Sequence, residues 1–223
     1  MSIVIPLYNE ARTISAMTRQ LEPLRSQCQV VFADGGSEDG TCEAVPEWAT
    51  LVRSSKGRGV QLNAGAAAAR GDILVFLHVD SRVPDDLPDQ VREVLAGSDM
   101  GFFGVSFDGA GWLLRACAMQ SNRRARHGIP FGDQGIFTWR EKFEQLGGFP
   151  DLPIMEDYQF SMNAHSAGYT VGQARTPLVT SARRFGNGFF HQLHVIVAMQ
   201  ILRWRYRHGA AAEELARAYR DIR

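Results

Sequence analysis

The stretch DILVFLHVDS, residues 72–81, decides how this chain is expected to fold. Five consecutive apolar residues, 73–77, show no polar alternation, which is typical of a strand covered on both faces in a parallel α/β sheet. The run then ends abruptly in His78, Asp80 and a serine hydroxyl. Because ligands of open α/β sheets bind at the carboxyl ends of strands, we predict that this strand delivers metal-type ligands to a site.

His78 and Asp80 lie two residues apart at the predicted strand end. At that spacing both side chains can point to one side and share a divalent cation with a phosphate. The alternative is a solvated Asp80 beside a His78 that only packs. The pattern by itself leaves both interpretations open.

The segments around this strand alternate between strand-like and helical patterns. Strands are expected at residues 2–6, 29–33 and 51–53. Helices are expected to open at residues 9–13, with apolar positions at helical spacing up to Leu24, and to cover residues 60–70. Alternating strands and helices imply a parallel sheet. The regular first half is therefore typical of a nucleotide-binding α/β unit.

The second half is less regular. Its expected elements are a helix at 86–95, a strand-like segment at 101–107, helices at 112–127 and 156–167, a Gly-rich segment at 130–137, an extended piece at 169–174, and a long apolar helix at 188–208 before a short charged tail. No repeat, low-complexity stretch or linker interrupts the chain, and 223 residues suffice for one sizeable core. We therefore expect a single α/β domain.

Composition argues against several classes of protein. The 24 basic and 24 acidic residues give no net charge, so no global field favours nucleic acid, although basic residues crowd 115–126 and the tail after Arg203. Cys28, Cys42 and Cys117 are odd in number and lack CxxC spacing, which argues against disulfides and structural zinc. No apolar run approaches the ~20 residues of a membrane span, and no signal segment is visible. We expect a cytoplasmic protein.

Two loops at the predicted ligand edge carry candidate binding residues. Asp34 precedes Gly35-Gly36-Ser37, so its carboxylate is placed to meet a base or ribose, or to cap the following turn. Lys56 and Arg58 are each followed by glycine, which lets the backbone approach a ligand while two cations meet a base or diphosphate. A plain basic loop is the alternative. Neither loop is a Walker P-loop or a dinucleotide GxGxxG motif.

Glu156 and Asp157 begin a predicted helix shortly after Pro153. Acidic residues at a helix start often serve only as caps or dipole partners. Adjacent carboxylates point in different directions on a helix, however, so one can cap while the other faces a pocket as a general base.

Five motifs in this order resemble the inverting family 2 glycosyltransferases of the GT-A fold: SIVIPLYNE at 2–10, ADGGSEDGT at 33–41, KGRGVQLNAGAAAARGDILVFLHVDS at 56–81, FGDQGIF at 131–137 and MEDYQFSMNAHSAG at 155–168. FLHVDS at 76–81 and TSARRF at 180–185 resemble most the bacterial radical-SAM/selenodomain-associated transferase 2 subgroup. The resemblance implies a mostly parallel, mixed sheet flanked by helices. It also implies one domain with a nucleotide-binding half at 1–80, an acceptor and catalytic half at 81–185, and C-terminal helices at 186–223.

The resemblance implies a role for each matching residue. Around the donor it places Pro6, Tyr8 and Glu10 near the base, Asp34 on the uracil or ribose, Arg58 near the base, and Arg183 and Arg184 near the phosphates or a closing loop. Around the reaction centre it places Asp80 on the metal, Asp157 as the catalytic carboxylate with Glu156 beside it, and Asp133 and Gln134 at sugar hydroxyls.

The implied activity is a metal-dependent, inverting transfer from a nucleotide sugar, expected to be a UDP-sugar, with Mn²⁺ or Mg²⁺ as cofactor. Asp157 would take the proton of an acceptor hydroxyl. The metal on Asp80, helped by Lys56 or an arginine, would offset charge on the departing diphosphate. One departure matters, because His78 replaces the family's usual first metal-site Asp. Imidazole suits Mn²⁺ or Zn²⁺ better than Mg²⁺, unless His78 is not a ligand.

Two other functions compete with this interpretation. A sugar-1-phosphate nucleotidyltransferase would favour a Gly-rich, basic signature after the first strand, where this chain has Leu7, Tyr8, Asn9 and Glu10. A noncatalytic sugar-nucleotide-binding module is disfavoured because Asp80 and Asp157 are both intact.

The apolar run FFHQLHVIVAMQIL, residues 189–202, bears on partners. Apolar residues nearly all round a helix favour burial in the core or between subunits, as in a homodimer. The flanking Trp204, with Arg203, Arg205 and Arg207, keeps open a peripheral contact with the inner face of the membrane and a lipid-linked acceptor.

Overall fold

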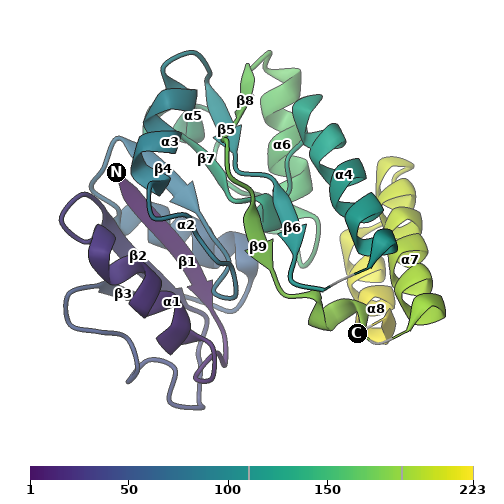
Figure 1. Ribbon diagram of the computed structural model, residues 1–223, viewed down its shortest axis with the longest axis horizontal. Coiled ribbons are helices and arrows are strands. Elements are labelled where there is room, and N and C mark those ends of the chain that lie inside the picture. Colours follow the sequence, from purple (N-terminus) through teal and green to yellow (C-terminus); the bar gives the residue numbers. More distant parts are fainter. Residues whose placement is uncertain (110, 187, 223) are drawn as a thin grey trace.

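The computed structural model describes residues 1–109, 111–186 and 188–222, without the side chains of residues 183, 184 and 220–222. A twisted central sheet is flanked by helices on both faces, and three further helices gather at the end of the molecule remote from the first three strands (Figure 1). This is the single α/β domain with a mixed sheet that the sequence predicts.

The central sheet has seven strands in the spatial order β3-β2-β1-β4-β7-β5-β8. They are β1 (Ser2–Leu7), β2 (Gln29–Asp34), β3 (Thr50–Arg53), β4 (Ile73–Phe76), β5 (Met100–Phe102), β7 (Ile136–Trp139) and β8 (Val171–Gln173). β1 to β4 are parallel, and β7 runs antiparallel to both β4 and β5. A separate parallel pair joins β6 (Val105–Phe107) to β9 (Leu178–Thr180). The carboxyl ends of β1, β2 and β4 therefore meet at one edge.

The helices follow the strands along the chain. They are α1 (Ile14–Leu21), α2 (Arg58–Ala68), α3 (Leu87–Leu95), α4 (Trp112–Arg126), α5 (Arg140–Gln145), α6 (Glu156–Ser166), α7 (Phe189–Arg207) and α8 (Ala212–Ile222). Three short 3-10 turns complete them: η1 (Glu22–Leu24), η2 (Gly132–Gln134) and η3 (Ala182–Phe185).

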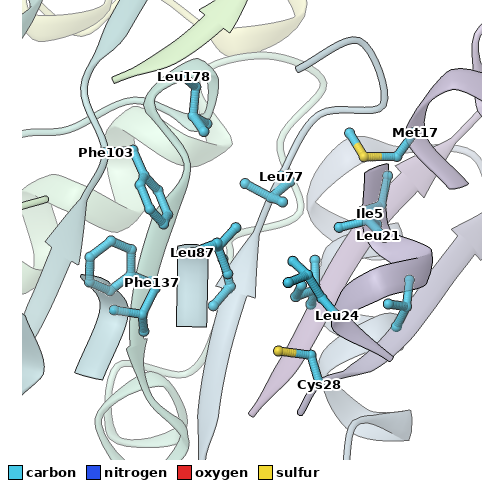
Figure 2. Close-up of a cluster of buried hydrophobic side chains, with 14 of the residues drawn as sticks. Ile5, Met17, Leu21, Leu24, Cys28, Leu77, Leu87, Phe103, Phe137 and Leu178 are labelled. Carbon is cyan, nitrogen blue, oxygen red and sulfur yellow. The ribbon is translucent and has the colours of Figure 1, made fainter. Parts of the chain in front are cut away.

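Side-chain alternation along β1 explains the layers. Ile3, Ile5 and Leu7 join a buried cluster with α1 and α3, whereas Val4 joins a second cluster with α2, α5 and α6. Successive strand residues point to opposite faces, so a strand buried on both faces must be apolar throughout. Figure 2 shows the first cluster, with Ile5 close to Met17 and Leu21 of α1. Phe103 and Phe137 belong to the same cluster and lie farther along the sheet.

The first helix begins later than the pattern at residues 9–13 indicates. α1 starts at Ile14, and Asn9 adopts a positive φ of 55°. Asn9 donates its N–H to Ser37 Oγ at 2.9 Å, and its side chain accepts the N–H of Glu38 at 3.0 Å. These bonds tie the loop after β1 to the loop after β2. They also explain the late start of α1, because short polar side chains that bond to backbone groups compete with helix formation.

The segment 101–107, which the sequence indicates as one extended piece, is two strands in different sheets. Gly104, with φ of 80°, separates β5 from β6. The side chain of Asn122 in α4 bonds both the N–H and the C=O of Val105, at 2.9 and 3.0 Å. The Asn122 side chain of α4 therefore takes the hydrogen bonds of the Val105 backbone, and β6 pairs outside the central sheet.

The C-terminal region is formed by α7 and α8. The charged tail forms the helix α8, whose Leu215 packs with Leu202 of α7 and Tyr158 of α6. Among the described residues of α7, only Val195 and Leu202 are buried, so packing in the core of this chain accounts for little of its apolar surface. Of the helices that the structure describes, none has the length and apolar character required to cross a bilayer.

α2 is held against the sheet by two of its residues. A Cβ at Gly65 would lie 2.4 Å from Val4 Cγ1, so only glycine permits this close approach. One turn earlier, the buried amide of Gln61 donates to the carbonyls of Leu7 and Ala33 at 2.6 and 2.9 Å. Gln61 thus links the ends of β1 and β2 to the start of α2, where Arg58 lies.

We expect Gln61→Leu to lower the free energy of unfolding by about 1–3 kcal/mol, because it removes the amide donor from two buried carbonyls. Urea unfolding measures the difference. Gln27→Leu is the control, since Gln27 is exposed in a loop, and its effect should stay within about 0.5 kcal/mol. A Gln61 variant as stable as this control would show that the carbonyls do not depend on the amide.

Candidate active site

The loops after β1 and β2 form one wall of the ligand edge. Besides the bonds of Asn9, Glu10 donates its N–H to Thr41 Oγ1 at 2.7 Å, and Ala11 donates to Asp39 Oδ2 at 3.1 Å. The Glu10 carboxylate accepts the Thr13 hydroxyl of its own loop. Pro6 lies within β1, half-buried, just before this wall. These bonds hold residues 8–11 rigidly beside the carboxyl end of β2.

Asp34 ends β2 and caps the turn that follows it. Its Oδ2 accepts the N–H groups of Gly36 and Ser37 at 2.9 and 3.0 Å. Burial opposes ionisation, but the hydrogen bonds from Ser37 and Gly36 outweigh it and hold the pKa of Asp34 below its ordinary value. Oδ1 is buried without a hydrogen-bond partner among the described residues. The turn cap that the sequence allows is present, and the second carboxylate oxygen is buried with its hydrogen-bonding capacity unsatisfied among the described residues.

Lys56 and Tyr8 meet across the edge from separate loops. The Lys56 Nζ lies 3.8 Å from the centre of the Tyr8 ring, a cation–π contact. Tyr8 keeps 40% of its surface exposed, so its ring offers a face to a planar ligand. The two residues that the sequence assigns to a base and a diphosphate therefore lie together.

A second group of predicted residues meets at η2. Gly132 donates its N–H to Asp157 Oδ2 at 2.7 Å. A Cβ at this position would lie 3.0 Å from His78 Nε2 and 3.1 Å from Asp157 Oδ2, so the absence of a side chain lets both groups approach the turn. Arg58, His78, Gly132 and Asp157 line one narrow pocket together with apolar side chains. Segments from α2, the end of β4, η2 and α6 thus converge.

Glu156 and Asp157 occupy different environments although they are adjacent. Met155 precedes them in the left-handed conformation with φ of 68°. Glu156 is 4% exposed and lies 3.8 Å from the Arg58 guanidinium. Burial and the charge of the neighbouring Asp157 raise the pKa of Glu156, Arg58 opposes them, and together they bring it to about 7. Glu156 is therefore a buried partner of Arg58, whereas Asp157 faces the pocket.

Arg58 connects the carboxylates at this edge. Burial lowers its pKa, but the charges of Glu156, Asp157 and Asp80 outweigh burial and raise it. Asp80 thus lies within electrostatic reach of the same guanidinium as the two carboxylates of α6. Only Gly57 separates Arg58 from Lys56, so the start of α2 joins the two groups of predicted residues.

The side chains of His78 and Asp80 offer an imidazole and a carboxylate, which are ordinary ligands of Mn²⁺. Within the part of the chain that the structure describes, no three His, Cys, Asp or Glu side chains gather as a complete metal site. This donor set fits a cation that takes its remaining ligands from a diphosphate and water, as Mg²⁺ commonly does. It does not fit a cation held by protein side chains alone.

Two predicted sugar contacts lie in η2, and the structure uses them differently. The Gln134 side chain is fully buried, its oxygen accepting from Phe131 N–H and Arg124, and its nitrogen donating to Asn122. This amide braces η2 against α4 and is not presented to a sugar. Asp133 lies half-buried in the same turn, and its charge acts on Arg124. The side chains of Arg183 and Arg184 lie outside the described part of the chain.

Two arginines that the sequence did not assign to the site lie behind η2. The guanidinium of Arg124 in α4 lies 3.5 Å from the centre of the Phe131 ring, and that of Arg203 in α7 lies 5.9 Å from it. Burial lowers the pKa of Arg124 to about 10, although Asp133 opposes the shift. The basic runs at 115–126 and after Arg203 carry this signal in the sequence, but no spacing rule connects the two runs.

Comparison with known proteins identifies the family. The sequence model of Glycosyl transferase family 2 matches residues 2–149, which include Asp34, Arg58, His78 and Asp80. This match covers more than half of the chain, and the chain therefore belongs to glycosyl transferase family 2. Glu156 and Asp157 lie beyond the matched segment.

Several curated relatives share part of this sequence. Undecaprenyl-phosphate 4-deoxy-4-formamido-L-arabinose transferase of Aeromonas hydrophila is 32% identical over an alignment of 114 residues that covers 44% of this chain and 35% of that protein. Glycosyltransferase AglE of Haloferax volcanii is 25% identical over 216 residues, covering 87% of this chain and 71% of AglE. The chain thus spans about a third of the length of the first relative.

Two solved structures share the architecture. The mannosyltransferase PcManGT from Pyrobaculum calidifontis, in complex with GDP-Man and Mn²⁺, superposes with a TM-score of 0.65 at 24% identity, over 99% of this chain and 69% of that one. S. aureus TarS 1-349 in complex with UDP-GlcNAc has a TM-score of 0.62 at 18% identity, over 90% and 66%. These likenesses show that the fold is GT-A.

The raised pKa of Glu156 predicts a pH dependence of stability. A carboxyl whose folded-state pKa is raised contributes stability that is fully present below its ordinary pKa and is lost as the pH rises through about 7. Glu156→Gln cannot ionise, so from pH 5 to pH 8 it should gain about 1–3 kcal/mol of unfolding free energy relative to the native protein.

Urea unfolding at several pH values measures this gain. Glu47→Gln is the control, because Glu47 is exposed in a loop, and its pH profile should follow that of the native chain. Parallel profiles for Glu156→Gln and the native protein would contradict a raised pKa for Glu156.

Proposed function

We propose that this chain is a metal-dependent, inverting glycosyltransferase that uses a nucleotide-sugar donor, a UDP-sugar by preference, and a hydroxyl acceptor. One observation carries the proposal: the Asp157 carboxylate is held by Gly132 in a pocket shared with Arg58 and His78. A group so placed beside a nucleotide-type edge has the position of a general base. Family membership makes glycosyl transfer the class of reaction.

The donor would lie along the carboxyl ends of β1, β2 and β4. The exposed face of Tyr8 suits stacking on a base, and the second oxygen of Asp34 is an acceptor for a base N–H or a ribose hydroxyl. Lys56, stacked on Tyr8, is placed to meet a phosphate. The order base, ribose, diphosphate then runs towards Arg58 and Asp80.

Asp157 would act on the acceptor. Its Oδ2 accepts the Gly132 N–H and its Oδ1 accepts the Tyr158 N–H, which orients the carboxylate and leaves further lone pairs free. An acceptor hydroxyl bound here loses its proton to Asp157 as its oxygen attacks the anomeric carbon from the face opposite the diphosphate. Configuration inverts, and no covalent enzyme intermediate is needed.

Asp80, with His78 beside it, would hold the divalent cation against the donor diphosphate. When bound, Mn²⁺ or Mg²⁺ offsets the negative charge that grows on the departing nucleoside diphosphate. Arg58 contributes fixed positive charge at the same edge, and Glu156 positions Arg58 through their ion pair. A nucleotidyltransferase would favour a Gly-rich, basic loop after β1. The loop present here has neither feature and is bonded through Asn9 to the loop after β2.

The acceptor in our proposal is lipid-linked. The name of the Aeromonas hydrophila relative describes transfer to undecaprenyl phosphate, and the overlap with this chain supports an acceptor carried on a lipid. The proton transfer to Asp157 requires that this lipid-linked acceptor present a hydroxyl group, since a lipid phosphate is already ionised at neutral pH. The reaction would then take place at the cytoplasmic face of a membrane, with the protein bound peripherally.

The general-base role predicts that Asp157→Asn lowers the rate of transfer by about 10²- to 10⁴-fold with little change in donor affinity. The amide keeps the shape and the hydrogen bond from Gly132 but cannot accept a proton. Glu156→Gln is the adjacent control and should cost less. Transfer assays with a donor identified by thermal stabilisation provide the test, and an Asp157→Asn enzyme with near-native rate would overturn the mechanism.

The metal role predicts that Mn²⁺ strengthens nucleotide-sugar binding in the native protein and fails to do so in Asp80→Asn. A ligand that binds only the folded state raises the melting temperature, so thermal shifts with Mn²⁺ or with EDTA give the answer. Asp72→Asn is the matched control, because Asp72 is exposed at the opposite end of the same strand. In His78→Ala, loss of the Mn²⁺ response identifies the imidazole as a ligand, and retention identifies it as a packing group.

A further inference from the structure

The outer face of α7 carries exposed apolar side chains along its length, interrupted by the exposed His194. Phe190 is 84% exposed, Val197 46%, Ile201 51% and Trp204 60%. Their spacing of three, four or seven residues places them on one side of the helix. A soluble helix normally turns polar residues outwards and buries such a stripe. This stripe is instead presented to the surroundings.

α4 extends the exposed apolar surface. Trp112 is 69% exposed and Met119 is 72% exposed. α4 and α7 pack together, and the rings of Trp112 and Phe189 lie 5.9 Å apart. Both helices lie at the end of the molecule remote from β1 to β3 (Figure 1). We call the exposed side chains of Trp112, Met119, Phe190, Val197, Ile201 and Trp204 the α4–α7 face.

The charged side chains of α4 and α7 themselves are all of one sign. Residues 112–126 and 189–207 contain no Asp or Glu, although the chain has 24 acidic residues. The same two segments contain Arg115, Arg123, Arg124, Arg126, Arg203, Arg205 and Arg207. Arg115, Arg123, Arg126 and Arg207 are exposed, whereas Arg205 pairs with Glu214 of α8. Because α4 and α7 carry seven arginines and no acid, and Glu214 of α8 offsets only one of them, this apolar face has an excess of positive charge. It is complementary to a surface that is apolar below and negatively charged above.

The inner side of the same helices approaches the reaction centre. Arg124 of α4 and Arg203 of α7 both lie over the Phe131 ring. The next residue, Gly132, donates its N–H to Asp157. A substrate at the α4–α7 face is thus separated from the proposed general base by a single layer of helices.

We propose that the α4–α7 face is a docking surface for an anionic lipid bilayer, on which α4 and α7 lie in the plane of the headgroups. Apolar side chains flanked by Trp and Arg have the composition of such interfacial helices. A second copy of the chain fits less well, because an isologous contact would bring these arginines against each other with no acid on either helix to pair with. The inference deepens the proposed function, since it rests on a lipid-linked acceptor.

Binding to vesicles tests the surface without any transfer assay. The native protein should co-sediment with vesicles of phosphatidylcholine containing about 30% phosphatidylglycerol, with binding that weakens as salt rises. The double variants Phe190→Ser/Ile201→Ser and Arg115→Gln/Arg123→Gln should each lower vesicle affinity by at least about tenfold. The controls are Trp139→Ser, a half-exposed aromatic on β7, and Arg19→Gln/Arg25→Gln, two exposed arginines near α1. Both controls should bind as the native protein does.

Two results would overturn the proposal. One is a native protein that stays in solution with anionic vesicles, or surface variants that bind them normally. The other is a native dimer in sedimentation velocity that Phe190→Ser/Ile201→Ser converts to monomer, which would make the face a contact between subunits. Thermal stabilisation by the donor nucleotide should be unchanged in every variant. A native protein that does not bind vesicles but is stabilised by the donor nucleotide would refute the docking surface and leave the proposed function intact. A native protein that the donor nucleotide does not stabilise would instead count against the proposed function.

Discussion

The hydrogen bond from Gly132 to Asp157 is the contact on which the candidate site depends. It joins η2 to α6 at a residue without a side chain, beside both the imidazole of His78 and the carboxylate of Asp157. A Cβ here would lie 3.0 and 3.1 Å from those polar atoms. An alanine would therefore require the two side chains to shift by a few tenths of an ångström, which would change the spacing between the proposed base and His78.

Adjacent carboxylates take different roles because burial differs between them. Glu156 is buried beside Arg58, and its pKa rises to about 7, which costs stability at neutral pH. Asp157 keeps access to the pocket. The chain therefore gives up some stability to hold Arg58 at the start of α2. Such a trade of stability for a positioned charge is common where function requires it.

The C-terminal helices have two distinct sides. On the inner side, Arg124 and Arg203 support Phe131, while Leu202 and Leu215 join α7 and α8 to Tyr158 of α6. On the outer side, the α4–α7 face remains apolar. The same pair of helices thus completes the wall of the site and supplies the surface at which we place the acceptor.

The sequence by itself determined that the strands of the nucleotide half are parallel, that β4 is buried, and that His78, Asp80 and Asp34 lie at strand ends, because these follow from local periodicity and from the geometry of parallel strands. The tertiary structure alone decided the rest. Gln61 bonds carbonyls that lie 54 and 28 positions away in the sequence. The Gln134 amide donates to Asn122 of α4, and the outer face of the apolar helix α7 is exposed. Hydrophobic pattern reports which residues favour burial, but only the packing of distant elements decides which of them are buried.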